Sequence, residues 1–570
     1  NQVAVAAKKR HNFHTRAACT NVLASASWQW RHVNSFTPKE LEFTGREKIN
    51  PSLPKEAIPY DYFRLYFTDE IISKIVSETN LYASQFIDNN AENLKPHSNV
   101  RNWVPTDPNE MKTFFGLIIL MGIVHKPRLN MYWSGDQLYS TPIYSEIMTR
   151  DRFLLLLKFL HFANNEEYDA KDPNRDRLFK IRKLCDMLRE RCRKVFTPGR
   201  DLCVDESLVL FKGRLAFKQF IRTKRARFGI KLYQLCTSNG ITLDYRIYHG
   251  SMQDELQENN DMLTTENIVL TLLDGYLGAG RVVYLDNFYT TPKLAAHLLN
   301  SHKTHLVGTV RPNRKNFPRD LAKVMPEKGR SLFFADVEKN ILAVKYRAHV
   351  DKADKTPKVV YLLSTLHAAT TEFTGKKDRK ELPISKPSCV ISYNKQMGGV
   401  DLVDQQLDQV HVLRRTYKWY KKLSLRLIMQ CLLNSHKLYH LRGGQHDFLK
   451  FMHDCVAILL SFTPRLSKPL PTDDTLHRLT GRLHLPGKRA READDPDSKM
   501  PNKTKKCRVC SARGESSRTC VPKTVYVCED CPSQPGLHLL GNPSCFRIYH
   551  SVLDYSKASR PTLSNESPEQ

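Results

Sequence analysis

Hydrophobic positions in the first third of the chain follow the helical period. The segments MKTFFGLIILMGIV (111–124) and RDRFLLLLKFLHFA (150–163) carry apolar residues on more than one face, as buried helices do. A third segment, KIRKLCDMLRERCRKVF (180–196), ends at the break Thr197-Pro198-Gly199, which stops a helix. We therefore expect a helical domain over residues 60–199. Residues 1–59 are polar and basic with little periodicity, and are predicted to be mostly flexible.

From residue 200 the pattern becomes that of strands. The segments DLCVDESLVLF (201–211), RFGIKLYQLC (227–236) and ITLDYRIYH (241–249) are predicted strands, and the dipeptide Asn239-Gly240 is a strong hairpin signal between the last two. A helix around 267–275, the strand RVVYLDNFY (281–289) and the helix PKLAAHLLNSH (292–302) follow. Strands followed by strand–helix alternation indicate a mixed sheet covered by helices, and we expect this α/β core over 200–311 and 387–410.

The remaining segments complete a multi-domain chain. Residues 312–386 contain strand-like pieces between charged loops and are predicted to form an inserted β-rich domain. Residues 411–463 are predicted to be a second helical part, with helix from 418 to about 462. Residues 464–506 are rich in Pro, Asp and Lys and are predicted to be a linker. A Cys/His module over 507–553 precedes a polar tail over 554–570.

The charge balance narrows the class of partner. The 570 residues include 88 Lys and Arg against 59 Asp and Glu, a formal charge of +29, which favours a polyanion such as nucleic acid. The longest apolar run, Phe114 to Val124, is far shorter than the roughly 20 residues that span a bilayer, which argues against a membrane protein. The N-terminal stretch does not resemble a secretory signal, so we expect a reducing compartment.

Three aspartates occupy positions that call for an explanation. Asp205 lies in the first strand of the expected sheet, Asp286 ends an apolar strand, and Asp401 follows Gly398-Gly399 at a helix start. Turn formation or helix capping would explain single positions, but strand interiors disfavour Asp. Phosphoryl transfer with two Mg²⁺ ions roughly 4 Å apart needs converging carboxylates. Three aspartates from separate segments meet that requirement.

Six of the 14 Cys lie between Cys507 and Cys545. The two CxxC pairs in this run are a strong zinc signal, since each presents two thiolates to one tetrahedral ion, and eight potential ligands suit two zinc ions. A cluster of reduced thiols is the alternative. The same spacing also occurs in RING and PHD fingers, so the module alone equally fits a ubiquitin ligase or a chromatin reader. The candidate ligands are Cys507, Cys510, Cys520, Cys528, Cys531, His538, Cys545 and His550.

Basic residues gather in three groups. The first is Arg222, Lys224, Arg225 and Arg227; the second is Arg311, Arg314 and Lys315; the third is Arg414, Arg415, Lys418, Lys421 and Lys422, interleaved with Tyr417, Trp419 and Tyr420. A solvated face explains the first group equally well. Cations and aromatic rings together favour DNA contact by the third group. A core position is the alternative for Trp419.

The chain resembles the piggyBac transposase family. The matching stretches are VDESLVLFKGR with FGIKLYQLC, YLDNFYT, HLVGTVRPNRK, and YNKQMGGVDLVDQ followed by RRTYKWYKKL, and they span about residues 60–463. The resemblance implies an RNase H-like core whose Asp-Asp-Asp triad is Asp205, Asp286 and Asp401. Asp404 matches a further acidic position, although a helix N-terminal carboxylate explains it equally well.

The resemblance also implies an activity. A cut-and-paste transposase would nick transposon ends, form hairpins on them and integrate at TTAA, acting as a nuclear homodimer on terminal-repeat DNA. The helical parts would serve in dimerisation and DNA binding, and Arg311, Arg314 and the third basic group would contact DNA. Alternatives are a domesticated DNA-binding relative without turnover and a zinc-finger chromatin protein. By resemblance, Cys528, Cys531, Cys545 and His550 would hold one zinc. Cys507, Cys510 and His538 would hold the other, with Cys520 as fourth ligand.

Overall fold

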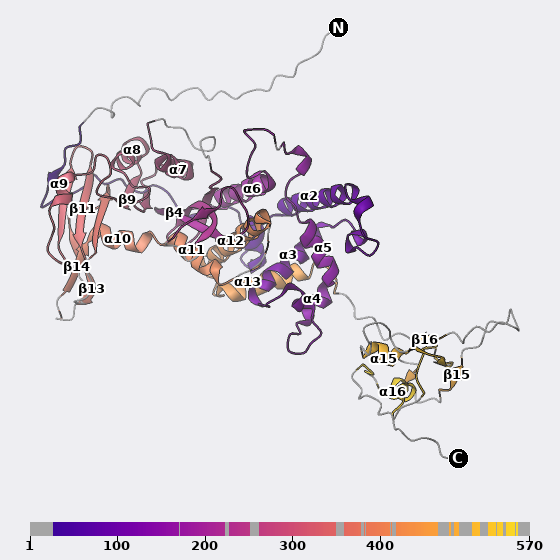
Figure 1. Cartoon of the computed structure of the whole chain (residues 1–570). Helices are drawn as coiled ribbons and strands as arrows, with labels where there is room; N and C mark the ends of the chain where they lie inside the picture. The colour runs from indigo at the N-terminus through magenta and orange to yellow at the C-terminus, as the bar shows by residue number, and fades with distance from the viewer. Residues whose placement is uncertain are drawn as a thin grey trace, which may run out of the picture. The chain divides into compact units, whose positions relative to one another are not determined.

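The chain falls into two compact units, residues 1–465 and residues 466–570, which are described one after the other (Figure 1). A computed structural model describes residues 27–169, 171–222, 227–250, 261–348, 358–377, 381, 383–410, 412, 416, 418–465, 478–479, 484–488, 504–513, 523–531, 533–539, 543–552 and 554–556.

The helical region of the first unit is built from two stretches that are distant in sequence. Its helices are α1 (Pro59–Tyr66), α2 (Asp69–Asp88), α3 (Pro108–Ile123), α4 (Pro142–Ile147), α5 (Arg150–Phe159), α6 (Phe179–Val195), α12 (Trp419–Leu441) and α13 (Phe448–Leu460). The helices expected at 111–124, 150–163 and 180–196 correspond to α3, α5 and α6. The side chains of Thr68, Asp107 and Thr149 accept main-chain N–H groups and begin α2, α3 and α5.

Helix α3 is buried on nearly all sides, as its apolar sequence predicts. Phe114 and Phe115 are completely buried. Gly116 faces α13, and a Cβ at this position would lie only 2.9 Å from the Cβ of Leu459. Glycine therefore lets α3 and α13 pack at close range.

The second helical part contains a break at Gly443-Gly444. The predicted stretch from 418 to 462 is two helices, α12 and α13. Gly443 has a φ of +88° in the turn between them, a conformation that favours glycine. Asp447 then begins α13 by accepting the N–H of Lys450 at 2.8 Å.

A ten-stranded mixed sheet carries the rest of the first unit. The strands are β1 (Arg31–His32), β4 (Asp201–Leu210), β5 (Gln219–Phe220), β6 (Phe228–Thr237), β7 (Thr242–Ile247), β8 (Val282–Leu285), β9 (His305–Thr309), β10 (Ser331–Asp336), β11 (Ile341–Arg347) and β12 (Val359–Ser364). Their order is β1-β10-β11-β12-β9-β8-β4-β6-β5, with β7 on β6; β4, β8 and β9 are parallel neighbours, and the other pairs are antiparallel.

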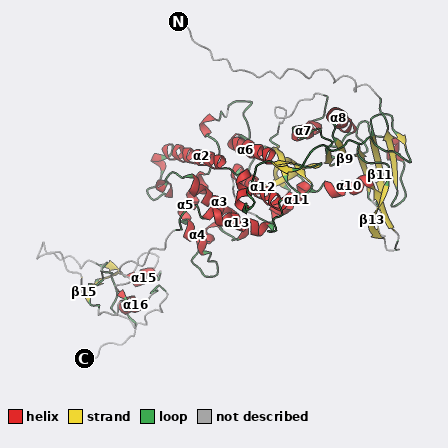
Figure 2. Cartoon of the chain, turned by 180° about the vertical axis from the view of Figure 1, so that it is seen from behind, coloured by secondary structure: helices red, strands yellow, loops and turns green. Residues whose placement is uncertain are grey.

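Helices cover the sheet, as expected. α7 (Thr264–Leu273) and α8 (Pro292–His302) lie on the opposite side from α10 (Ser388–Gln396) and α11 (Gly399–Asp408) (Figure 2). The predicted hairpin turn forms between β6 and β7, where Gly240 has a φ of +84°. The mixed α/β architecture predicted from the sequence is confirmed.

The strands expected in an insertion continue the core sheet. β12 pairs with β9, with Leu363 opposite Gly308, and β11, β10 and β1 extend the sheet from there. The short helix α9 (Arg319–Lys323) precedes β10, and β13 (Thr371–Lys377) and β14 (Pro383–Pro387) form a separate hairpin. Residues 312–386 are thus hydrogen-bonded directly to the core.

The N-terminal strap, residues 28–50, is ordered against the first unit. Its β1 pairs with β10, and the indole N–H of Trp30 donates to the Asn316 carbonyl at 2.8 Å. Further along, β2 (Lys48–Ile49) pairs with β3 (Phe196–Thr197). The predicted flexibility is therefore wrong for the strap, because apolar anchors and main-chain pairing hold it; residues 1–26 lie outside the described residues.

The second unit consists of short elements. They are β15 (Pro486–Lys488), β16 (Lys505–Lys506), α15 (Arg508–Ala512), β17 (Lys523–Thr524), β18 (Tyr526–Cys528) and α16 (Cys545–Ser551). Its buried cluster contains nine residues, of which five are Cys, so cysteine side chains make up most of its core. None of the helices described in either unit is long and apolar enough to cross a membrane.

Candidate active site and metal centres

The parallel strands β4 and β8 bring Asp205 and Asp286 side by side. The register pairs Cys203 with Tyr284 and Val204 with Leu285, so the next residue on each strand is an aspartate. β8 ends at Leu285, and the Asp286 carboxylate accepts the N–H of Phe288 at 2.8 Å. A turn role and a site role therefore coexist at Asp286.

Helix α11, which carries Asp401 in its first turn, packs against the strand that carries Asp205. Side chains of alternate strand residues share a face, so Cys203, Asp205 and Ser207 point together. A Cβ at Gly399 would lie 2.7 Å from Cys203 Sγ, and Ser207 Oγ donates to Asp404 Oδ1 at 2.6 Å. Helix α11 therefore packs on the face of β4 that carries Asp205.

The surroundings of Asp286 disfavour an extra negative charge. Burial, and to a lesser degree the nearby Glu206 carboxylate, raise the pKa of Asp286. Burial and, to a lesser degree, the charges of Asp286 and Asp205 raise the pKa of Tyr393 to about 12. Bound cations would relieve the repulsion between these carboxylates.

Asp404 is engaged differently from the other three aspartates. Besides Ser207, its Oδ1 atom accepts the Arg426 Nη2 group at 2.6 Å, and Arg426 reaches it from α12. Burial lowers the pKa of Arg426, while the Asp404 charge opposes that shift. The ion pair joins α11 to α12, which gives Asp404 a bracing role.

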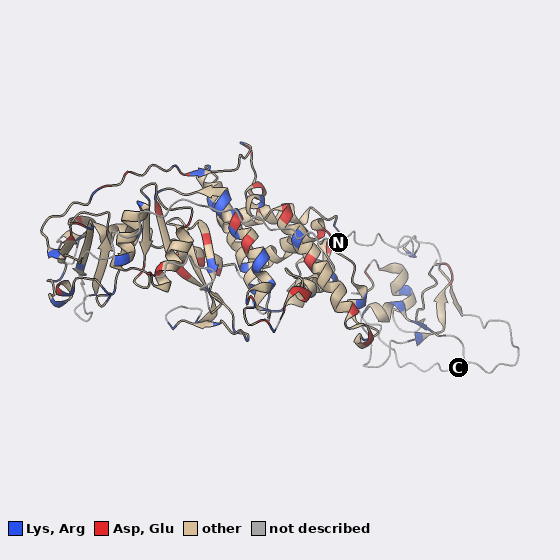
Figure 3. Cartoon of the chain, turned by 90° about the horizontal axis from the view of Figure 1, so that it is seen from above, with Lys and Arg blue, Asp and Glu red and all other residues tan. Residues whose placement is uncertain are grey.

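Asp401 and Asp404 line a large groove. It has a volume of about 1540 Å³. Its basic residues are Lys212, Lys218, Arg227, Lys422 and Arg426. Elsewhere on the first unit basic and acidic positions are interspersed along helices and strands (Figure 3). The groove therefore combines these five basic side chains with three aspartates, Asp401, Asp404 and Asp408.

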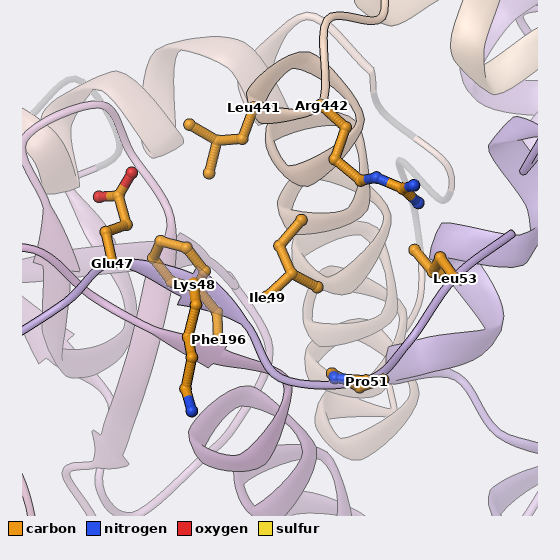
Figure 4. A pocket seen from close by; sticks show the side chains of 8 residues that line it. All are labelled: Glu47, Lys48, Ile49, Pro51, Leu53, Phe196, Leu441 and Arg442. Carbon is orange, nitrogen blue, oxygen red and sulfur yellow. The ribbon is translucent and has the colours of Figure 1, made fainter. Parts of the chain in front are cut away.

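A second cavity lies away from these aspartates. Its volume is about 340 Å³, and it is enclosed by the strap, β3 and the end of α12 (Figure 4). The lining residues are Glu47, Lys48, Ile49, Pro51, Leu53, Phe196, Leu441 and Arg442. None of them is a site residue predicted from the sequence.

The second unit gathers Cys and His side chains into two groups of four. One group is His484, Cys528, Cys531 and His550, and the other is Cys507, Cys510, His538 and Cys545. Within each group the ligand atoms lie within 4.8 Å of one another. Among the described residues, these are the groups of three or more Cys, His, Asp or Glu that are spaced to hold one metal ion.

The spacings fit tetrahedral coordination. Cys510 Sγ lies 3.6 Å from Cys545 Sγ and 3.5 Å from His538 Nδ1. Cys531 Sγ lies 3.7 Å from His484 Nδ1 and 3.6 Å from His550 Nε2. Bonds of about 2.3 Å to sulfur and about 2.0 Å to nitrogen at tetrahedral angles would give about 3.8 Å between sulfurs and about 3.5 Å between sulfur and nitrogen. The donor sets therefore suit zinc.

The grouping inferred by resemblance is wrong for Cys545. It joins Cys507, Cys510 and His538, not the group of His550. Cys545 and His550 are five residues apart on α16, so their side chains leave the helix about 140° apart and reach different groups. Cys520, the expected fourth ligand, lies outside the described residues.

His484 is the ligand that sequence reasoning missed. It stands in the predicted linker, and its Nδ1 atom lies 3.5 Å from Cys528 Sγ. A single histidine far from any CxxC pair gives no local signal. The available clue was that each ion needs four ligands, which made an upstream His worth considering.

Comparisons of the family, the sequence and the structure each found similar proteins. A family profile described as Transposase IS4 matches residues 58–436. In sequence, the chain is 28% identical to the PiggyBac transposable element-derived protein 3 of Homo sapiens over 409 residues, 70% of this chain and 64% of that protein. It is 26% identical to the human PiggyBac transposable element-derived protein 2 over 414 residues, 71% of this chain and 66% of that protein.

A solved structure is also similar. The cryo-EM structure of the piggyBac transposase synaptic complex with hairpin DNA has a TM-score of 0.61 and 25% identity, covering 82% of this chain and 96% of that one. The chain belongs to the piggyBac transposase family. It spans just under two thirds of the length of the two human piggyBac relatives.

The basic residues of this piggyBac-family chain differ in their surroundings. Arg311 and Lys315 are exposed, whereas Arg314 donates to the main-chain carbonyls of Asn287 and Phe288 at 3.0 and 2.6 Å. Arg314 therefore braces the turn that follows Asp286. Arg222 and Arg227 are exposed; Lys224, Arg225, Arg414, Arg415 and Tyr417 lie outside the described residues.

The expected DNA contact through Lys421 is not supported. Its side chain is buried and donates to the carbonyls of Leu157 and Lys158 at the end of α5, at 2.6 and 2.8 Å. Burial lowers the pKa of Lys421 to about 7. Lys418 is exposed, Lys422 lines the groove, and Trp419 is partly buried with its ring 5.4 Å from Phe217. Trp419 is thus mainly a packing residue in this structure.

Proposed function

We propose that this chain is a DNA transposase that acts by cut-and-paste transposition, with an RNase H-like catalytic core. The observation that carries the proposal is the side-by-side register of Asp205 and Asp286 on β4 and at the end of β8, with the helix that carries Asp401 packed against β4. The family match and the likeness to a transposase complex with DNA support it.

Each aspartate would contribute an oxygen ligand to the catalytic metals. Asp205, Asp286 and Asp401 would hold two Mg²⁺ ions, which supply an activated nucleophile and stabilise the leaving oxygen. Burial and the nearby Glu206 charge raise the pKa of Asp286, so a bound cation would stabilise its ionised form. Arg311, donating to Asn287 Oδ1 at 3.1 Å, is placed to position a phosphate beside Asp286.

The second unit completes the proposal. Its two Cys/His groups would each hold a structural zinc ion, and the zinc module would recognise the transposon end. We further propose that the protein works in the nucleus as a homodimer, because two transposon ends have to be joined together, and that TTAA is its target.

An excision assay in cells tests the proposal. The protein would be paired with terminal-repeat DNA from its own genomic locus, and seamless repair at TTAA would be scored. Asp286→Asn is expected to abolish strand cleavage and to leave DNA binding intact. The matched control Asp320→Asn changes an exposed aspartate on α9 and is expected to excise normally.

The negative result is equally informative. DNA binding without excision, in a well-expressed wild-type chain, would identify a domesticated DNA-binding protein without turnover. Excision that survives Asp286→Asn would refute the assignment of the aspartates.

A further inference from the structure

Two exposed aromatic side chains stand together at the edge of the large groove. Phe220 on β5 and Phe228 on β6 are opposite one another in the strand register, with ring centroids 4.8 Å apart. Their exposed fractions are 56% and 45%. Neither ring contributes to the buried core, so packing of the first unit does not account for the pair.

The hairpin holds the pair in place. The N–H of Ile221 donates to the Arg227 carbonyl at 2.9 Å, which closes β5 onto β6. On the other side, a Cβ at Gly229 would lie 2.3 Å from the Val209 carbonyl, so glycine lets β6 approach β4 closely. The rings are presented on paired backbone.

Basic side chains lie near Phe228 in the same groove as two of the aspartates. Lys218 Nζ stands 5.9 Å from the centre of the Phe228 ring. Phe228, Lys218, Lys212 and Arg227 line the same groove as Asp401 and Asp404. Cations attract the phosphate backbone without regard to sequence, while flat rings offer a stacking surface to a base that has no pairing partner.

We propose that Phe220 and Phe228 form a stacking platform for an unpaired nucleotide of the DNA strand that lies in this groove. The inference rests on the proposed transposase function, because strand cleavage and hairpin formation expose bases that have lost their partners. The charge of the groove favours a nucleic acid as occupant, since a protein partner at this position would need a matching acidic surface. Within a duplex, stacked neighbours cover both faces of each interior base, so the rings can reach only the outer faces of the terminal pairs.

Fluorescence anisotropy on the full chain tests the platform. Two arbitrary-sequence probes would be compared, a blunt duplex and the same duplex with an unpaired overhang. The wild type is expected to prefer the overhang, and Phe228→Ala or Phe220→Ala to weaken overhang binding by about tenfold with duplex binding unchanged. Phe228→Tyr, which keeps a ring, is expected to retain the preference.

The controls separate stacking from other effects. Phe373→Ala removes a phenylalanine with a similar exposed fraction, 55%, on β13, and is expected to change nothing. Lys218→Gln is expected to weaken both probes together. An overhang carrying a photoreactive halogenated base is expected to cross-link to Phe220 or Phe228, located by mass spectrometry.

Four results would overturn the platform. An unchanged overhang preference in both Ala variants is the first, and equal weakening of both probes is the second. A change of oligomeric state without a change in DNA affinity would make the pair a contact between chains. If the wild type binds neither probe, the proposed function fails as well. If the wild type excises normally and the Phe substitutions have no effect, the platform alone is refuted.

Discussion

The two units of this chain stabilise their folds in different ways. The first unit surrounds a continuous apolar core drawn from helices and sheet, in which Phe114, Tyr66 and Leu432 are completely buried. The second unit buries five Cys among nine core residues, and those Cys belong to the two groups of potential metal ligands. Apolar burial provides the driving force in the first unit, whereas among the described residues of the second unit potential metal ligands make up most of the buried cluster.

Metal removal should produce the largest difference between the units. A strong chelator is expected to unfold residues 466–570 and to leave the first unit folded, because structural zinc contributes roughly 10–16 kcal/mol to small modules. Limited proteolysis with mass spectrometry would locate the cleavage sites. Digestion of both units at the same rate would contradict the comparison.

Ligand substitutions make this test specific. Cys528→Ser and His484→Ala are each expected to reduce the zinc content measured by elemental analysis, because each removes one of four ligands from the same ion. Cys520→Ser is the matched control and is expected to keep both ions, since Cys507, Cys510, His538 and Cys545 already supply four ligands. Zinc lost on Cys520→Ser would restore the grouping inferred by resemblance.

A cavity in the first unit should destabilise that unit and leave the zinc content of the second unit unchanged. Phe114→Ala is expected to lower the free energy of unfolding of the first unit by about 3–5 kcal/mol, because it removes a fully buried ring. All five Trp lie in the first unit, so tryptophan fluorescence during denaturation reports on that unit alone. Zinc content should stay unchanged; Phe373→Ala, at an exposed position, serves as the control.

Substitution of the buried Lys421 should have a smaller effect on the stability of the first unit. Lys421→Met is expected to destabilise the first unit by about 1–3 kcal/mol, because the carbonyls of Leu157 and Lys158 lose their donor. Lys418→Met changes an exposed neighbour and should be nearly neutral. If DNA affinity falls with Lys421→Met while stability does not, Lys421 is a DNA contact after all.

Mild acid should have the smallest effect on the stability of the first unit. Burial lowers the pKa of His161 to about 4, so the folded state keeps this ring neutral while the unfolded chain takes up a proton near its ordinary value. Stability is therefore lost as pH falls from about 6.5 toward 4, by about 0.7 kcal/mol between pH 7 and 6 for one such histidine. His161→Gln should flatten the measured pH dependence by that amount. An unchanged pH dependence would show that His161 is protonated in the folded state.

Much of the fold could be predicted because strong periodicity coincided with clear breaks. The run from Asp201 to Phe211 and the turn at Asn239-Gly240 fixed the first strands. The break between α12 and α13 coincides with Gly443-Gly444, a turn signal inside the helical stretch predicted from 418 to about 462. The strap escaped because two-residue strands and scattered anchors such as the Trp30 indole hold it, and these leave no repeating signal.

The candidate site was predictable only in part, because its contacts depend on register and packing between segments that are distant in sequence. Asp205 and Asp286 stood out against apolar strands, but their adjacency depends on the β4–β8 register. The Asp404–Arg426 pair and the burial of Lys421 depend on how α12 packs, and a lysine in a basic run gives no sign of being enclosed. His484 required knowledge of a long-range contact.

The order of the ligands along the second unit has a consequence for how it assembles. One group contributes His484, the other Cys507 and Cys510, the first again Cys528 and Cys531, the other His538 and Cys545, and the first finally His550. Capture of either ion closes loops that contain ligands of the other, so the entropy of loop closure is shared between the two binding events. Loading should be all-or-none: at limiting zinc the protein would divide into filled and empty molecules, with few that carry a single ion.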